Sequence, residues 1–138
     1  MGLNPYINFD GTTREAVEYY SKVFGVEPIQ VSTYAEMPGD PSYPVPEEAK
    51  GRIAYAGLPI AGGLLHFSDI WPGMPFTVGN NITVMVDSED MEMLRSLFNQ
   101  LQEGGKVDME LQETFWSKLY GSVTDKFGIG WQFNHSAA

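Results

Sequence analysis

Cysteine is absent from this sequence of 138 residues, and histidine occurs only twice. Without cysteine the chain has no disulfide framework, no thiolate zinc site and no cysteine nucleophile. Basic residues are also scarce, because eight Lys and Arg stand against eighteen Asp and Glu, which gives a formal net charge of −10. Such an acidic surface repels phosphate backbones, so we expect no nucleic-acid partner.

Long apolar runs are missing as well. No run approaches the roughly 20 residues that span a bilayer, and residues 1–5 lack the basic and apolar segments of a secretory signal. We therefore expect a cytoplasmic protein with no membrane partner. Hydrophobic residues nevertheless make up 43% of the chain and aromatic residues 13%, which is enough for a single globular domain over residues 1–138.

The first half of the chain predicts a strand, a helix and three more strands. The helix begins at a Thr12-x-x-Glu15 pattern, which has the form of a capping box, and Gly25 is placed to end it. Period-2 alternation and β-branched residues favour strands at residues 6–9, 29–34, 52–58 and 64–69.

The second half repeats this order of elements. A strand at residues 82–86 precedes a helix that we expect Asp87 or Ser88 to cap, and Gly104 and Gly105 end that helix. Three further strands are predicted: one at residues 106–112, one that includes Val123 and Thr124 and ends at a turn over residues 125–128, and one at residues 129–134.

This internal repeat predicts an α+β fold of two paired βαβββ modules, about residues 3–70 and 80–135. One such unit does not bury both faces of a curved sheet. We therefore expect the two modules to form a curved, half-open sheet of eight strands with the helices outside.

Residues 35–50 separate two strands of the first module and are rich in proline and acidic residues. The four prolines exclude a helix or a central strand within the run from Met37 to Pro46. A lid, a dimer-contacting arm and a tolerated insertion all fit a loop of this length.

Several short motifs are shared with a known family. They are Phe9-Asp-Gly11, Glu15-Ala16, Tyr19-Tyr20, Val23-Phe-Gly25, Ile60-Ala-Gly-Gly63, Gly79-Asn-Asn81, Gly104-Gly-Lys-Val107, Leu111-Gln-Glu-Thr-Phe-Trp116, Tyr120-Gly121 and Asp125-Lys-Phe-Gly128. Together they run over nearly the whole chain and resemble the PhnB-like branch of the glyoxalase/bleomycin-resistance/dioxygenase (vicinal oxygen chelate) superfamily.

The resemblance implies a glyoxalase-like fold, a homodimer, and a cavity inside each curved sheet. In metal-dependent relatives such as glyoxalase I, the first and last strands of each module supply the metal ligands. The resemblance carries these positions to Tyr6 (or Asn4), His66, Asn81 and Gln132.

Strand parity supports a shared face for these residues. Alternate residues of a strand point to opposite sides, so Tyr6 and Asn8, His66 and Ser68, Asn81 and Thr83, and Gln132 and Asn134 are expected on polar faces. The apolar faces, where the helices should pack, would then carry Ile7 and Phe9, Leu65 and Phe67, Ile82 and Val84, and Trp131 and Phe133.

A catalytic divalent metal needs about three or more His or carboxylate donors. The implied positions offer one imidazole, with amides and a phenol as the rest, which are poor ligands for transition metals. We therefore expect no metal and no other cofactor, and no phosphonate site either, because no Lys or Arg is expected on the cavity face.

The predicted ligand-binding residues are Tyr6, Asn8, Tyr55, His66, Asn81, Trp116 and Gln132. His66 is the candidate catalytic residue, as a hydrogen-bond donor or general base, or it lines the cavity and is satisfied by a neighbour. The amides of Asn8, Asn81 and Gln132 either orient a polar ligand or bond to one another. The side on which Tyr55 faces is open.

The sequence thus predicts a metal-free protein that binds or sequesters a small molecule, with aromatic side chains such as Trp116 as a stacking wall or a dimer contact. The alternative is an enzyme of the same superfamily that uses His66 with Tyr6 and Gln132 on a small polar substrate. A metal-dependent lyase or dioxygenase is the weakest of the three interpretations.

Overall fold

The structure is a computed structural model that describes residues 1–37, 39 and 42–136. The chain divides into two compact units, Met1–Thr77 and Val78–Ala138, and each contains one four-stranded sheet. None of the helices in the described part of the chain is long and apolar enough to cross a bilayer.

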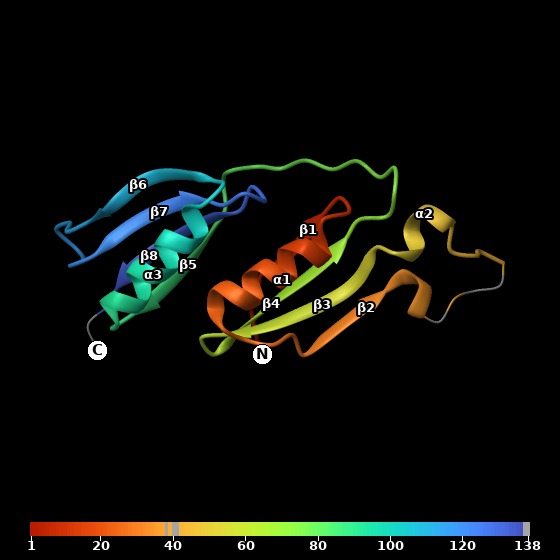
Figure 1. Cartoon of the computed structure of the whole chain (residues 1–138), viewed down its shortest axis with the longest axis horizontal. Helices are drawn as coiled ribbons and strands as arrows, with labels where there is room; N and C mark the ends of the chain where they lie inside the picture. Colours follow the sequence, from red (N-terminus) through yellow and green to blue (C-terminus); the bar gives the residue numbers. More distant parts are fainter. Residues whose placement is uncertain (38, 40–41, 137–138) are drawn as a thin grey trace. The chain divides into compact units, whose positions relative to one another are not determined.

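Unit 1 has its sheet in the order β1-β4-β3-β2 (Figure 1). β1 pairs with β4 in parallel, and the other neighbours are antiparallel. Its elements are β1 (Tyr6–Phe9), α1 (Thr13–Phe24), β2 (Gln30–Thr33), the 3-10 helix η1 (Tyr34–Glu36), α2 (Glu47–Lys50), β3 (Ile53–Ile60) and β4 (Gly63–Asp69).

Unit 2 repeats this topology in the order β5-β8-β7-β6, again with its first and last strands in parallel. Its elements are β5 (Thr83–Ser88), α3 (Met91–Gln102), β6 (Lys106–Gln112), β7 (Tyr120–Thr124) and β8 (Gly130–His135). The predicted α+β fold with two βαβββ repeats is confirmed, and the eight strands form two sheets of four.

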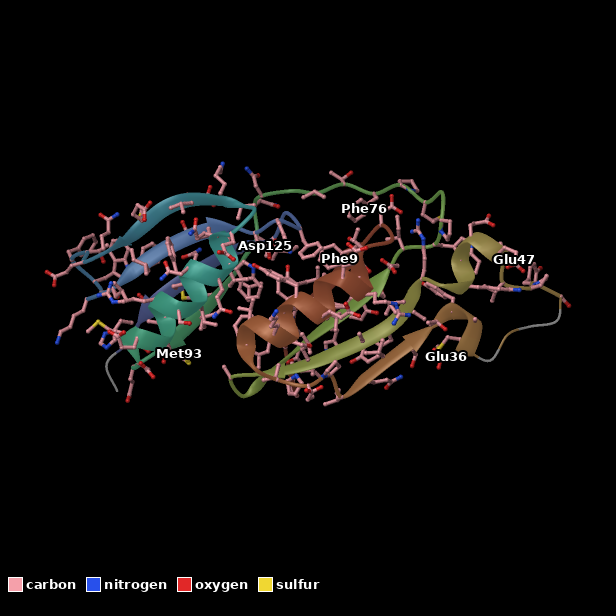
Figure 2. The ribbon with its side chains drawn as sticks, viewed as in Figure 1. Phe9, Glu36, Glu47, Phe76, Met93 and Asp125 are labelled. Carbon is pink, nitrogen blue, oxygen red and sulfur yellow. The ribbon has the colours of Figure 1, made fainter. Side chains whose placement is uncertain are left out.

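One helix covers one face of each sheet. In unit 1, Tyr20 of α1 stacks on Phe67 of β4 with ring centroids 5.7 Å apart, and in unit 2 Phe98 of α3 meets Phe133 of β8 edge-on at 5.7 Å. Leu94 of α3 is fully buried, whereas the neighbouring Met93 points outward and is 41% exposed (Figure 2). The faces opposite the helices carry the polar side chains.

The predicted apolar face is confirmed at Phe9, Phe67, Trp131 and Phe133, which are all buried, and it is wrong at Ile82. Ile82 precedes β5 and is 81% exposed. The first residue of the predicted strand therefore lies outside the ladder, where the alternation of faces no longer applies.

Both predicted helix caps differ from the structure. Thr12 is the N-cap residue of α1 but makes no side-chain capping bond, and the N–H of the next residue, Thr13, donates to the Asp69 carboxylate. At α3 the cap is Asp90, whose carboxylate accepts the N–H of Met93 at 3.1 Å, rather than Asp87 or Ser88.

The predicted turn at residues 59–63 is shorter in the structure, because β3 continues through Pro59 to Ile60. β2 pairs with β3 only as far as Gly57. Pro59, which has no N–H to donate, therefore lies on a free edge of β3, where a strand tolerates it.

The Pro-rich segment contains η1 and α2 at its ends, and Thr33 and Glu36 form a capping box there. Residues 38, 40 and 41 lie outside the described residues. The predictions of a lid, an arm or a tolerated insertion stay predictions.

Candidate functional site

The polar face of unit 1 brings together four of the predicted ligand-binding residues. The parallel register of β1 and β4 places Tyr6 beside His66 and Asn8 beside Ser68. Tyr55 of β3 faces the same side as His66, which answers the question that the sequence left open. The exposed fraction of Tyr6 is 51%, so this face is accessible at the start of β1.

His66 is held between two tyrosines. The Tyr55 hydroxyl shares a hydrogen bond of 2.6 Å with His66 Nδ1. The Tyr6 ring lies parallel to the imidazole, with 9° between the planes and 5.7 Å between the centroids. These two contacts fix the orientation of the imidazole, whose Nδ1 is engaged by Tyr55.

Asn8 lies one pleat further along the same face. Its Oδ1 accepts a hydrogen bond of 3.0 Å from the hydroxyl of Ser68, which is only 7% exposed. Asn8 therefore satisfies a buried neighbour, and its partner is a hydroxyl rather than one of the other two amides.

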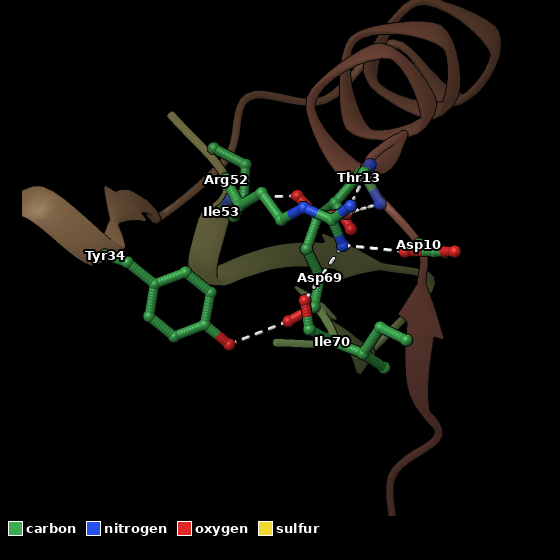
Figure 3. Close-up of polar contacts among 8 residues, drawn as sticks. Asp10, Thr13, Tyr34, Arg52, Ile53, Asp69 and Ile70 are labelled. Atoms are coloured by element: carbon green, nitrogen blue, oxygen red, sulfur yellow. Dashed lines mark hydrogen bonds and ion pairs between the residues drawn. The ribbon is translucent and has the colours of Figure 1, made fainter. Parts of the chain in front are cut away.

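Asp69, at the end of β4, is the anchor of this region (Figure 3). It is 2% exposed, and its carboxylate accepts backbone N–H groups from Gly11, Thr13 and Ile53 at 2.9 to 3.1 Å. Strand parity puts Asp69 on the face opposite Ser68 but does not show these bonds, because the partners of Asp69 lie 16 to 58 residues away in the chain.

Around Asp69, two more side chains tie loops to β4. Arg52 donates to Asp10 at 2.7 Å and to the carbonyl of Ile70 at 3.0 Å, and the Tyr34 hydroxyl donates to the carbonyl of Asp69 at 2.7 Å (Figure 3). Burial raises the pKa of Tyr34, and the nearby Tyr6 and Asp69 raise it further. Tyr34 therefore keeps its proton and stays a donor.

The open face of unit 2 contains a cavity of about 750 Å³. Gln132 of β8 lies on its floor, and its amide connects the neighbouring strands. The lining residues are Val78, Gly79, Asn80, Ile82, Thr83, Lys106, Asp108, Tyr120, Ser122, Val123, Thr124, Gly128, Gly130, Trp131 and Gln132.

The Gln132 amide is held at both of its ends. The Tyr120 hydroxyl donates to Gln132 Oε1, and Gln132 Nε2 donates to Thr83 Oγ1 at 2.6 Å. Sequence analysis expected Thr83 and Gln132 on polar faces but missed the role of Tyr120, since strand parity does not show which strands are neighbours.

Asn81 and Trp116 take different positions from Gln132. Asn81 lies in a bend before β5 and is exposed, and the residues that line the cavity there are its neighbours Asn80 and Ile82. Trp116 lies between β6 and β7, is 55% exposed, and meets the Tyr120 ring edge-on at 5.3 Å. Trp116 thus supports the aromatic ring whose hydroxyl reaches Gln132.

The prediction that no Lys or Arg lines a cavity is wrong, because Lys106 lies at the edge of the one in unit 2. It is paired with Asp108 at 3.2 Å. A hydrogen bond from Thr124, followed by the Lys106 charge, lowers the pKa of Asp108. The pair adds no net charge to the cavity, and Lys106 and Asp108 are the only charged residues among those that line it.

The turn before β8 has its own buried carboxylate. Asp125 is 3% exposed and accepts hydrogen bonds from the backbone of Phe127 and Ile129 and from the indole Nε1 of Trp131 at 2.8 to 3.1 Å. These bonds fix the start of β8 two residues before Gln132.

The donors at the positions that hold metal in glyoxalase I do not fit a transition metal. Unit 1 supplies Tyr6 and His66, whose Nδ1 is engaged by Tyr55, and unit 2 supplies Asn81 and Gln132. No group of three or more His, Cys, Asp or Glu side chains that could hold a metal occurs among residues 1–37, 39 and 42–136.

With this geometry established, the chain can be placed among known proteins. It matches the Glyoxalase/Bleomycin resistance protein/Dioxygenase superfamily over residues 2–133, and it belongs to that superfamily. The predicted assignment to the PhnB-like branch is confirmed.

Three relatives show how close this likeness is. Protein YjdN from Escherichia coli (strain K12) is 34% identical over 97% of this chain and 95% of its own length. Protein PA1353 from Pseudomonas aeruginosa has a TM-score of 0.88 at 29% identity, over 99% of this chain and 98% of that chain. A Bacillus cereus PhnB protein, described as a putative 3-demethylubiquinone-9 3-methyltransferase, has a TM-score of 0.79 at 24% identity over 99% and 100% of the two chains, a likeness of fold alone.

Proposed function

We propose that this chain binds or sequesters an uncharged small molecule without a metal. The observation that carries the proposal is the cavity of about 750 Å³ on the open face of unit 2. Its volume lies in the range of small-molecule sites. Its polar lining consists of amides and hydroxyls, together with one ion pair that cancels its own charge.

The aromatic side chains around Gln132 support the same proposal. Tyr120 lines the cavity, and its ring is braced by Trp116. An apolar wall with a few fixed polar groups is typical of sites that orient an organic ligand. The predicted homodimer and the predicted sharing of one ligand by Tyr6, Asn8, Tyr55, His66, Asn81, Trp116 and Gln132 stay predictions.

A thermal-shift screen of uncharged organic compounds tests this function, run with and without a chelator. We expect several compounds to raise the unfolding temperature equally in both conditions. Gln132→Ala should remove most of the shift, whereas Tyr43→Phe, which removes an exposed hydroxyl from unit 1, should leave it unchanged. A shift that requires metal, or no shift with any compound, would contradict the proposal.

A second function, proton transfer by an enzyme, is favoured by the environment of His66. The Tyr55 hydrogen bond at 2.6 Å and the stacked Tyr6 ring fix the imidazole in one orientation, as a general base requires. If the chain is an enzyme, His66→Ala should abolish a turnover that chelator leaves intact, and Tyr55→Phe should reduce it. Full turnover by His66→Ala would exclude this alternative.

A further inference from the structure

The three side chains Thr83, Gln132 and Tyr120 form a hydrogen-bonded chain across the floor of the unit 2 cavity. They come from three adjacent strands, β5, β8 and β7. Gly130 lies directly opposite Thr83 in the parallel register, and a Cβ at Gly130 would approach Thr83 Cγ2 to 2.8 Å. The absence of a side chain at Gly130 therefore leaves the space in which Thr83 reaches Gln132.

The hydrogens of these three side chains determine which hydrogen bonds they can donate to a ligand. The Tyr120 hydroxyl donates its only hydrogen to Gln132 Oε1, and Gln132 Nε2 donates one of its two hydrogens to Thr83 Oγ1. One amide hydrogen of Gln132 and the hydroxyl hydrogen of Thr83 remain. If the oxygen and nitrogen of the Gln132 amide exchanged places, Thr83 would donate to the amide oxygen, and the hydroxyl with a hydrogen left to donate would be that of Tyr120. Either way, one N–H and one O–H are left to donate.

The charges of the cavity decide which acceptor these donors suit. Lys106 is neutralised by Asp108 at 3.2 Å, and the whole chain has a formal net charge of −10. An anionic acceptor would meet no unpaired cation among the lining residues and would be repelled by the acidic surface. An uncharged oxygen acceptor avoids both costs.

We propose that the unit 2 cavity recognises uncharged compounds through a carbonyl oxygen, which accepts from the Gln132 amide and from the end hydroxyl of the Thr83–Gln132–Tyr120 chain. The apolar remainder of the compound packs on Val78 and Ile82, which also line the cavity and are exposed. This inference rests on the proposed function and narrows its ligand class. It assigns Thr83 and Tyr120 as specificity-determining residues.

Three probes of similar size separate the possibilities: acetophenone has a neutral carbonyl, benzoate an anionic acceptor and ethylbenzene none. We expect titration of the full chain, followed by amide NMR spectra, to show acetophenone shifting the Gln132 side-chain resonances. Its affinity should exceed that of the other two by roughly two- to tenfold for each net hydrogen bond. Tightest binding by benzoate, or equal binding of all three, would overturn the inference.

Substitutions locate the effect. In the double variant Thr83→Val with Tyr120→Phe, the Gln132 amide is the one donor of the three that remains, so acetophenone affinity should fall toward that of ethylbenzene, while ethylbenzene affinity is unchanged. Tyr43→Phe, which removes an exposed phenol hydroxyl from unit 1, should change neither. If the double variant fails to fold, Gln132→Ala, which removes the amide donor, should still lower acetophenone affinity roughly two- to tenfold, the effect of one hydrogen bond.

The outcomes also separate this inference from the proposed function. If acetophenone binds but shifts His66 instead of Gln132, the carbonyl site in unit 2 is wrong while small-molecule binding stands. If neither these probes nor the wider screen bind at all, both fail.

Discussion

At the scale of single residues, one buried carboxylate in each unit joins backbone segments that would otherwise have unsatisfied N–H groups. Asp69 connects the start of α1 and the start of β3 to the end of β4, and Asp125 connects its own turn to Trp131. Such bonds are strong because the acceptor is charged and water is excluded. Both residues lie close in sequence to the candidate ligand residues His66 and Gln132.

Replacing Asp69 with Asn should lower the free energy of unfolding by about 2–3 kcal/mol. Asn keeps the shape but has one acceptor oxygen, so at least one buried backbone N–H loses its partner. Urea denaturation measures the change. Asp10→Asn is the matched control, because its ion pair with Arg52 is exposed on the Asp10 side and should contribute less than about 1 kcal/mol. Equal losses in the two variants would contradict the anchoring role of Asp69.

A second prediction concerns Asp108, whose pKa is lowered mainly by the hydrogen bond from Thr124 at 2.7 Å. Because the folded pKa lies below the unfolded value, the stabilising effect is complete above the unfolded pKa and is lost as the pH falls through the folded pKa. Thr124→Val should raise the pKa of Asp108 toward its ordinary value of 3.8.

Carbon-13 NMR titration of the Asp108 carboxyl measures this shift directly. Lys106→Met is the comparison variant and should raise the pKa less, since the hydrogen bond and the charge of Lys106 each rank after the hydrogen bond from Thr124. A larger effect from Lys106→Met would show that the ion pair, and not the hydroxyl, controls Asp108.

The residues also show the limit of sequence reasoning about the site. Period-2 parity correctly predicted the shared face of Tyr6 and His66, because the pleat of a strand is a local property. The bonds from Tyr120 through Gln132 to Thr83 depend on which strands become neighbours, and parity carries no such information. The bond from the N–H of Thr13 to Asp69 was missed for the same reason, since the two residues lie 56 positions apart in the chain.

At the scale of elements, the two βαβββ repeats were predictable because helix and strand periods are written into the pattern of apolar residues. Boundaries were less accurate where they depend on tertiary partners. β3 extends past Leu58 to Ile60 because β4 pairs with it up to Gly63, and β5 begins only at Thr83, beside Gly130.

The connection from α3 to β6 gives a prediction at this scale. A Cβ at Gly105 would lie 2.2 Å from the carbonyl oxygen of Thr124, which is backbone and has little room to move. Gly105→Ala should therefore cost about 2–4 kcal/mol of unfolding free energy, as expected for overpacking against a fixed neighbour.

Gly51→Ala is the control for that measurement. Gly51 ends α2 with a φ of −86°, and a Cβ there would have no atom within 4 Å. Its substitution should leave stability unchanged or slightly raised. Chemical denaturation of the two variants compares them, and tolerance of Gly105→Ala would mean that the close approach of β6 to β7 relaxes freely.

At the scale of the whole molecule, charge is the dominant feature. Eighteen acidic residues outnumber eight basic ones, so negative charges repel one another across the surface. The exposed ion pairs of Lys50 with Glu47 and of Lys106 with Asp108 relieve little of this repulsion. We expect the melting temperature to rise by several degrees between about 0.01 M and about 1 M NaCl, as the Debye length falls from ~30 Å to ~3 Å.

Differential scanning calorimetry across that salt range tests the expectation. A variant with Gln in place of the exposed residues Glu89, Glu103 and Glu110 should show a smaller rise, because less repulsion remains to be screened. A melting temperature that falls with salt would show that attractive ion pairs outweigh the net negative charge.

The parallel pairing of the first and last strands in each unit has a consequence for how the protein is made. β1 receives its partner only when β4 is available, and β4 ends at Asp69, halfway along the 138 residues. A nascent chain leaving the ribosome therefore carries an unpaired β1 until half of the protein has been synthesised. During that interval the strand is open to mispairing with other chains, so slower translation through residues 53–69 would favour aggregation over folding.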